Sequence, residues 1–344
     1  METMIAHPVW QSVALGAHRL RNRLVLPPMA SQTGDDTGLV TAATVAHYTR
    51  TVRPSQGLAF VEYTTVHPWG RSEPQQLALY TNAHEAGLAQ LAALIRRQGV
   101  VPGIQLTLAG GKTDATLIGR QATGASALAV PAHGGDLPPP APLTASEITE
   151  LMDAFVESAL RAERAGFAVI EVHATHGYFF NQWLSPITNQ RDDAHGGSLA
   201  GRAGLLLGLI RRMKAALQPE TVVSVRFAAQ DRLPGGLTLE DGVWLAQALE
   251  AAGVGLLNVS SGLGGWRRGR EQRGEGYLVA DAAAMRREVG IPVIGVGGIQ
   301  TLAYAQTILA QGDVDLIAIG RAMLANPDWP WADAAPVAQQ ALTV

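Results

Sequence analysis

Cysteine is missing from all 344 residues of the chain. Its absence excludes disulfides, Cys-ligated zinc, iron–sulfur clusters and thiol nucleophiles. Charged residues are also few, at 16%, and the formal net charge is only −3, so no basic surface is expected to attract nucleic acid. No apolar run reaches the roughly 20 residues that span a bilayer, and the start METMIAHPVW lacks the charged-then-apolar order of a signal peptide. We therefore expect a soluble, cytoplasmic protein with neither nucleic-acid nor membrane partners.

A further absence concerns dinucleotide binding. No strand-like run leads into the G-x-G-x-x-G turn of a doubly wound sheet, and GVGGI at Gly295 fails the spacing. Instead, short β-branched runs alternate with amphipathic helices, which is typical of strands buried on both faces of a parallel sheet. These runs begin at Arg23, Leu58, Val100, Ala168, Val222, Gly255, Pro292 and Asp315.

Eight such units predict an α/β fold with a single (β/α)₈ TIM-barrel domain over residues 1–344. Residues 13–20 have the character of an N-terminal hairpin. Residues 113–142 are rich in Gly, Ala and Pro and predict a long extended loop after strand three. Two helices carry clear signals: one begins with the capping pattern at Thr144 and stops at Gly166, and the other begins at Thr238 and stops at Gly253.

Polar residues within apolar strands are the first candidates for a site. Gln105 lies in the predicted third strand and Arg226 in the fifth. An unpaired buried amide or guanidinium costs several kcal/mol, so each should meet a ligand or a protein partner. A satisfied core hydrogen bond for Gln105, and an ion pair of Arg226 with Glu171 or Asp231, are the alternatives.

Glycines mark the ends of the last two strands. Gly297 and Gly298 follow strand seven, and Gly320 with Arg321 follows strand eight. Barrels commonly bind a phosphate at this position through backbone N–H groups. Tight turns alone would also explain the glycines, but Arg321 favours an anion, so we expect a cofactor that carries a phosphate.

The fourth strand ends in two histidines and a tyrosine, in VHATHGY at Val172. His173 and His176 have the spacing of a metal pair, but no third ligand is close in sequence and no cysteine exists, so we expect no metal. Imidazole N–H groups can instead stabilise negative charge on a substrate oxygen, and the Tyr178 phenol can donate a proton.

With these residues in view, the chain resembles the Old Yellow Enzyme family of FMN-dependent oxidoreductases, most closely its bacterial thermophilic-like branch. The resemblance covers nearly the whole length. It rests on NRLVLPPM at Asn22, GIQLTLAGGK at Gly103, VHATHGYFFNQWLSPITNQRDDAHGGS at Val172, VSVRF at Val223, GVGGI at Gly295 and IGRAML at Ile319.

The resemblance implies an ene-reductase, an NAD(P)H:flavin oxidoreductase that reduces the C=C bond of α,β-unsaturated carbonyl compounds by a ping-pong mechanism. FMN would be bound, with NADPH or NADH as transient reductant, and the hydride would pass from flavin N5. His173 and His176 would bind the carbonyl oxygen of an enone-type substrate, and Tyr178 would supply the proton. The cofactor-binding residues would be Pro28, Met29, Ala30, Gln105, Arg226, Gly297, Gly298, Gly320 and Arg321.

The chain departs from the family at some of these positions, and two other functions stay open. Ala30 stands where the family usually has Cys or Thr, which predicts an altered flavin potential. The C-terminus WADAAPVAQQALTV has no arginine to insert into a neighbouring subunit, so a homo-oligomer stays open. A metal-dependent barrel lyase or hydrolase using His173 and His176 is the alternative enzyme, and a flavin-binding module without catalysis is the non-enzymatic one.

Overall fold

The computed structural model describes residues 7–131, 137–264 and 274–330. Eight strands close into a barrel in the order β10-β11-β12-β3-β4-β5-β8-β9, and every neighbouring pair reported in it is parallel. The strands are β3 (Leu24–Leu26), β4 (Leu58–Thr65), β5 (Val101–Thr107), β8 (Val169–Ala174), β9 (Val222–Ala228), β10 (Leu256–Ser260), β11 (Val293–Gly295) and β12 (Leu316–Ala318). The predicted (β/α)₈ barrel is confirmed.

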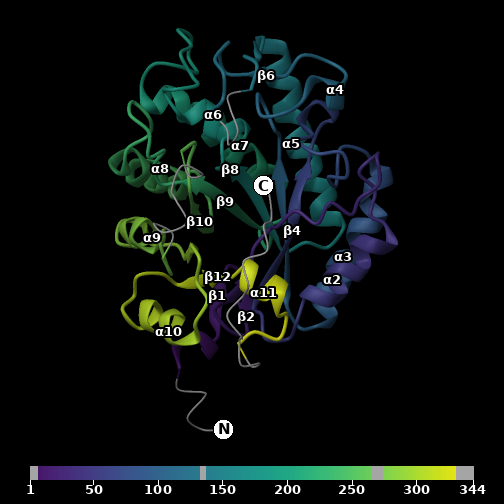
Figure 1. Cartoon of the computed structure of the whole chain (residues 1–344), viewed down its shortest axis with the longest axis vertical. Helices are drawn as coiled ribbons and strands as arrows, with labels where there is room; N and C mark the ends of the chain where they lie inside the picture. The colour runs from purple at the N-terminus through teal and green to yellow at the C-terminus, as the bar shows by residue number, and fades with distance from the viewer. Residues whose placement is uncertain (1–6, 132–136, 265–273, 331–344) are drawn as a thin grey trace.

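Helices follow the strands and cover the outside of the barrel (Figure 1). They are α2 (Ala42–Thr51), α3 (Glu85–Arg97), α5 (Ala145–Arg164), α7 (Leu199–Ala216), α8 (Leu239–Ala251), α9 (Val279–Arg286), α10 (Leu302–Ala310) and α11 (Arg321–Ala325). The capping box predicted at Thr144 is present, and the helix start predicted at Thr238 also has one, because each threonine accepts the backbone N–H three residues on. Within the described ranges, none of the helices is long and apolar enough to cross a membrane.

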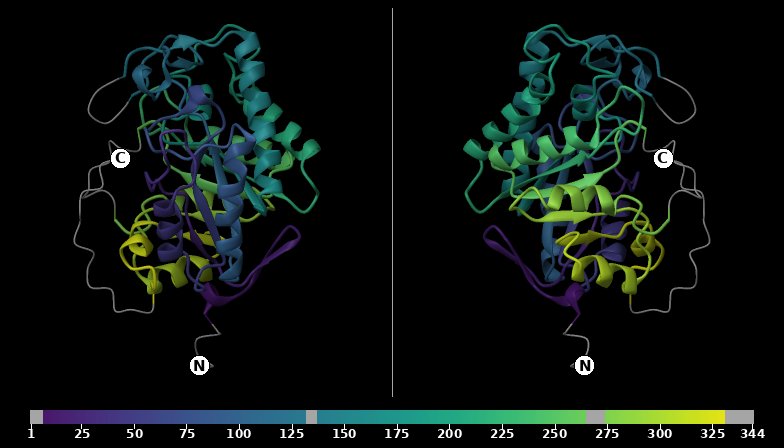
Figure 2. Two further views of the ribbon diagram at one scale, coloured as in Figure 1. Left: turned by 90° about the vertical axis from the view of Figure 1, so that its right-hand side faces the viewer. Right: turned by 90° about the vertical axis from the view of Figure 1, so that its left-hand side faces the viewer.

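The N-terminal hairpin is also confirmed. Strands β1 (Val13–Leu15) and β2 (His18–Leu20) pair antiparallel, and Figure 2 shows them projecting away from the barrel. His18 contacts the carbonyl of Glu220 through Nε2 at 2.9 Å, so the hairpin meets the turn that precedes β9. The preceding short helix is η1 (Pro8–Trp10).

The segment predicted as an extended loop is partly built from regular elements. It contains α4 (Ala115–Ile118) and the parallel pair β6 (Thr123–Gly124) and β7 (Ala141–Pro142), while residues 132–136 lie outside the described ranges. Three further short helices position the loops around the barrel: η2 (Pro68–Gly70), η3 (Asn82–His84) and α6 (Phe179–Leu184).

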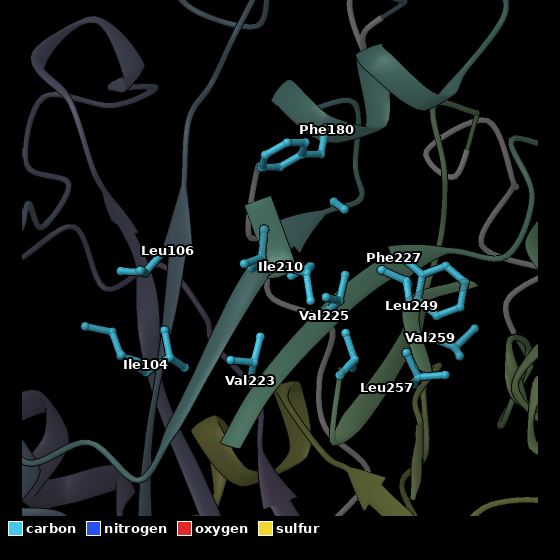
Figure 3. Close-up of a cluster of buried hydrophobic side chains, with 14 of the residues drawn as sticks. Ile104, Leu106, Phe180, Ile210, Val223, Val225, Phe227, Leu249, Leu257 and Val259 are labelled. Carbon is cyan, nitrogen blue, oxygen red and sulfur yellow. The ribbon is translucent and has the colours of Figure 1, made fainter. Parts of the chain in front are cut away.

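Alternation along the strands separates core from site. Figure 3 shows Ile104, Leu106, Val223, Val225, Phe227, Leu257 and Val259 on β5, β9 and β10 in one cluster with Ile210 of α7 and Leu249 of α8. The residues between them face the other way, since successive side chains of a strand point to opposite faces. These inward positions start with a buried apolar layer that includes Val169, Val222 and Leu256. Two residues further along, they become polar.

Strand β4 interrupts this alternation with an irregularity between Val61 and Tyr63. Val61 pairs with Ile104 and Tyr63 pairs with Gln105, so Glu62 is an extra residue in β4. Parallel partners in register lie on the same face of a sheet. The bulge therefore turns Tyr63 to the barrel interior beside Gln105.

Candidate active site

A buried carboxylate organises the polar layer inside the barrel. Glu171 is fully buried and accepts hydrogen bonds from Gln105 Nε2 at 2.7 Å, Asn258 Nδ2 at 3.0 Å and Ser224 Oγ at 3.2 Å. Burial raises the pKa of Glu171, and Arg226 acts against this by lowering it. Of the two partners considered for Arg226, Glu171 is therefore the one that it meets electrostatically. The other, Asp231, accepts the backbone N–H groups of Leu237 and Leu263.

Three side chains of this layer each keep one unused polar atom. Gln105 Oε1, Arg226 Nε and Asn258 Oδ1 are buried without a hydrogen-bond partner. Because Glu171 takes the amide N–H of Gln105, the free atom of Gln105 is an acceptor, whereas the free atom of Arg226 is a donor. An unpaired buried polar group is costly. This layer therefore suits a ligand edge that carries both N–H and C=O groups, as the pyrimidine edge of a flavin does.

The histidines lie above this layer, and one nitrogen of each ring has a hydrogen-bond partner in the protein. The backbone N–H of Thr175 donates to His173 Nδ1 at 3.4 Å, so the proton of a neutral His173 is on Nε2. Arg226 Nη2, which can only donate, lies 3.4 Å from Ser260 Oγ, and that hydroxyl is 2.8 Å from His176 Nε2. The Ser260 hydroxyl can donate to this nitrogen or accept from it, so the contact is compatible with a proton on either nitrogen of His176.

Both imidazoles are neutral at physiological pH. Burial, followed by the positive charge of Arg226, lowers the pKa of His173 and of His176 well below the usual value of 6.5. The two rings lie edge to face with their centroids 5.3 Å apart. Each ring thus offers one N–H donor without a full charge, the state in which an imidazole can polarise a carbonyl.

The turn that carries His176 is held in an uncommon conformation. His176 has φ 59° and Gly177 has φ 75°, in the left-handed region where a residue other than glycine costs about 1–3 kcal/mol. Lys112 Nζ donates to the carbonyl of His176 at 2.9 Å, Asn181 Oδ1 accepts the N–H of Gly177 at 2.8 Å, and Gln182 Nε2 donates to the carbonyl of Gly177 at 2.7 Å. The Asn-Gln pair in the motif thus fixes the direction of the histidine.

Tyr178 follows this turn as the N-cap residue of α6 and is 8% exposed. Its ring lies edge to face with His173 at a centroid distance of 4.9 Å. Burial raises the pKa of Tyr178, whereas hydrogen bonding to the side chains of Ser72 and Tyr63 lowers it. The phenol is therefore protonated at neutral pH beside the two imidazoles, and the structure brings the three predicted catalytic residues together.

Sequence reasoning missed three neighbours of Tyr178. The Tyr63 ring lies 5.8 Å from the Tyr178 ring, and its hydroxyl donates to Glu73 Oε1 at 3.2 Å. Lys112 Nζ is 4.8 Å from the centroid of the Tyr178 ring, and burial lowers its pKa. Lys112 lay within a quoted motif but had no assigned role. Tyr63 was hidden by the bulge in β4.

Glu62, the extra residue of the β4 bulge, holds the segment that follows β3. Pro28 is buried, and Met29 and Ala30 are partly buried. The next residue, Ser31, donates its backbone N–H to Glu62 Oε2 at 2.6 Å and its hydroxyl to Glu62 Oε1. Burial raises the pKa of Glu62 to about 7, although hydrogen bonds from Ser31 and Tyr48 lower it.

The glycines predicted to hold a phosphate lie at the adjacent ends of β11 and β12. Gly297 and Gly298 have φ 123° and 66°, and the carbonyl of Gly297 accepts the N–H groups of Gly276 and Tyr277. A Cβ on Gly320 would lie 2.7 Å from Met29 Sδ, so this turn packs directly on the segment after β3. Arg321 is exposed.

Two threonines at the end of β4 donate to backbone carbonyl groups of the protein itself. Thr64 donates to the carbonyl of Glu62, and Thr65 donates to that of His67. Within the described ranges, no group of three His, Asp or Glu side chains is arranged to hold a metal ion, so nothing in that part of the chain completes a metal site around His173 and His176. The C-terminal sequence bearing on subunit contacts lies outside the described residues.

Comparison with known proteins gives consistent matches. The model of the NADH:flavin oxidoreductase / NADH oxidase family matches residues 8–334. An NADPH dehydrogenase of Geobacillus thermodenitrificans is 36% identical over 316 residues, which cover 92% of this chain and 90% of that protein. An NADH oxidase of Thermoanaerobacter brockii is also 36% identical over 316 residues, but the match covers 90% of this chain and only 48% of that protein. The chain thus spans about half the length of that relative.

A solved structure supports the fold. The old yellow enzyme homologue from Zymomonas mobilis superimposes with a TM-score of 0.81 at 22% identity, covering 94% of this chain and 91% of that chain.

Proposed function

Because the chain belongs to the NADH:flavin oxidoreductase / NADH oxidase family, whose members include the Old Yellow Enzymes, we propose that it is an ene-reductase for α,β-unsaturated carbonyl compounds. It is a flavin-dependent oxidoreductase that takes FMN, with NADH or NADPH as the reductant. The proposal specifies the acceptor, an electron-poor C=C bond, and the order, in which reductant and acceptor occupy one pocket in turn.

One observation carries the choice of acceptor: two neutral imidazoles and a protonated phenol lie around the same point at the end of β8. Negative charge develops on the carbonyl oxygen when a hydride reaches the β carbon of an enone. The N–H groups of His173 and His176 can stabilise that charge as fixed donors. Tyr178, 4.9 Å from His173 between ring centroids, can then protonate the α carbon.

The polar layer below fits the cofactor of the family. When bound, FMN supplies a hydride to the substrate after accepting one from NAD(P)H. Gln105 and Arg226 would hold its pyrimidine edge through their unused acceptor and donor atoms. Arg226 is partly buried, with its Nε atom shielded from solvent, so its positive charge favours added negative charge on a neighbouring ring.

The remaining contacts complete the cofactor site. Pro28, Met29 and Ala30 would line the ring from the segment that Glu62 holds through Ser31. Gly297, Gly298, Gly320 and Arg321 would take the phosphate, because the turns after β11 and β12 lie side by side and Arg321 is exposed there.

The test is the visible spectrum of the purified protein under anaerobic conditions. We expect a flavin band that bleaches on addition of NADPH and returns on addition of 2-cyclohexenone. A band that bleaches but does not return with the enone would leave a flavin oxidoreductase with a different acceptor. A colourless protein that cannot be reconstituted with FMN would contradict the flavin assignment itself.

A further inference from the structure

Tyr178 needs a new proton after each turnover if it protonates the substrate, so the following inference rests on the proposed function. Each turnover would remove one proton from the Tyr178 hydroxyl. Tyr178 is only 8% exposed, and a substrate bound against His173 would cover the side of the phenol that faces the pocket. The proton therefore has to return through the protein.

A path of hydroxyl groups leads from Tyr178 through Tyr63 to Glu73. The Tyr63 ring lies 5.8 Å from the Tyr178 ring with 33° between the ring planes. The Tyr63 hydroxyl reaches Glu73 Oε1 at 3.2 Å. Hydrogen bonds from Ser72 act on both phenols. Glu73 is partly exposed and is held at its second oxygen by Gln32, so the path ends at the surface.

We propose that Tyr63 and Glu73 form a relay that returns a proton from solvent to Tyr178 after each turnover. The Tyr178 O–H bond breaks as the α carbon takes the proton, leaving a phenolate. Tyr63 gives its hydroxyl proton to that oxygen, and Tyr63 in turn takes a proton from the Glu73 carboxyl. Glu73 is protonated again by water or buffer, so one solvent proton enters for each proton delivered.

Other charged groups around the phenols do not offer this path. Lys112 approaches the face of the Tyr178 ring, not its hydroxyl, and donates to the carbonyl of His176. Arg226 faces Ser260, and His173 presents a neutral ring edge. Glu62, next to Tyr63 in β4, is occupied by Ser31 and Tyr48. Glu73 is the carboxylate that the Tyr63 hydroxyl contacts.

The relay predicts a difference between the first turnover and the following ones. In the reduced holoenzyme Tyr178 already carries its proton, so Glu73→Gln should reoxidise with 2-cyclohexenone no more slowly than the parent in a single turnover. At saturating NADPH and enone above pH 8, the steady-state rates of Glu73→Gln and Tyr63→Phe should fall about tenfold or more. Added imidazole should restore part of the Glu73→Gln rate by carrying protons.

Alternative outcomes are distinct. A slower first turnover in Glu73→Gln would mean that Glu73 only positions Tyr178. A parent-like steady state without buffer rescue would mean that protons enter elsewhere. Either result overturns the relay. Tyr178→Phe serves as the separate check on the proposed function, because it should slow the first turnover itself. Glu85→Gln, on α3 and paired with Arg164, is the control for loss of a surface carboxylate.

A measurement on the purified holoenzyme, without NADPH or enone, avoids catalysis altogether. Glu73 raises the pKa of both Tyr63 and Tyr178. Glu73→Gln should therefore move the tyrosine ionisation seen in the ultraviolet spectrum to lower pH, and Glu85→Gln should not. An unchanged titration would show that Glu73 does not face the phenols and would contradict the relay.

Discussion

Replacing His173 by alanine removes one of the two N–H donors that would face the carbonyl oxygen. Loss of one donor to a developing oxyanion costs about 2.7–4 kcal/mol, which is about 100- to 1000-fold in rate. A neutral hydrogen bond to the ground-state ketone is worth only about 0.5–1.5 kcal/mol, or about two- to tenfold in affinity. The His173 ring packs between Tyr178, His176 and Tyr63, and water entering its volume can still donate. We therefore expect the lower limit, about a 100-fold loss in rate.

Stopped-flow reoxidation of the reduced holoenzyme by 2-cyclohexenone measures this rate directly. His173→Asn restores an N–H donor and should recover about tenfold of the loss. His18→Ala, on the hairpin at the turn before β9, is the control and should match the parent. FMN content should be similar in all three variants, since the unused atoms that fit the ring edge belong to Gln105 and Arg226. Reoxidation of the alanine variant at the parent rate would refute the role of His173.

The charge state of the histidines adds a pH test to the same variant. Burial and Arg226 lower the pKa of both imidazoles well below 6.5, so neither gains a proton between pH 6 and pH 8. The ratio of parent to His173→Ala rates should therefore be constant over that range. A ratio that rises steeply toward pH 6 would show that a charged imidazolium, not a neutral donor, does the work.

Three further substitutions test other parts of the site. Tyr178→Phe should slow reoxidation by about 100-fold or more while reduction by NADPH keeps its rate, since only reoxidation by the enone needs its proton; equal reoxidation rates would assign the proton to another donor. Ala30→Cys should change the flavin reduction potential measured by redox titration, and no change would remove Ala30 as a determinant. Burial raises the pKa of Glu62 to about 7, so the fold loses about 3 kcal/mol of unfolding free energy as this carboxyl ionises between pH 4.5 and 7. Glu62→Gln should remove this loss, as measured by denaturant titrations of both proteins at pH 5 and pH 8. If the unfolding free energy of the variant fell with pH as much as that of the parent, Glu62 would not be the group responsible.

The sequence predicted the barrel because its strand runs are compact and separated by well-capped helices. Strand ends were less predictable. The run from Arg23 to Met29 reads as one strand, yet only Leu24–Leu26 pair in the barrel. Pro27 and Pro28 have no N–H to donate to a neighbouring strand. The backbone leaves the sheet there, and this places the segment up to Ala30 at the barrel mouth.

Sequence reasoning found His173 and Arg226 but missed the hydrogen bonds around Glu171, because these depend on how the strands pair. His173 and Arg226 lie in regular strands, where alternation and strand ends can be read from the chain, and they pair directly across β8 and β9. The hydrogen bonds around Glu171 could not be read from the sequence, because their donors Gln105, Ser224 and Asn258 lie on three other strands and meet only through the register of the barrel. The unused atoms of Gln105 and Arg226 also appear only when every neighbour is placed.

The bulge in β4 explains why the largest omissions cluster at one place. With strict alternation from the inward-facing Phe60, Glu62 would point into the barrel and Tyr63 would point out. The extra residue reverses both positions: Tyr63 pairs with Gln105 and reaches Glu73, while Glu62 leaves the ladder and binds Ser31. One inserted position thus supplies a phenol beside Tyr178 and a carboxylate that holds the segment after β3. A bulge beside a site re-aims side chains in this way, so the two functions of β4 depend on the same backbone irregularity.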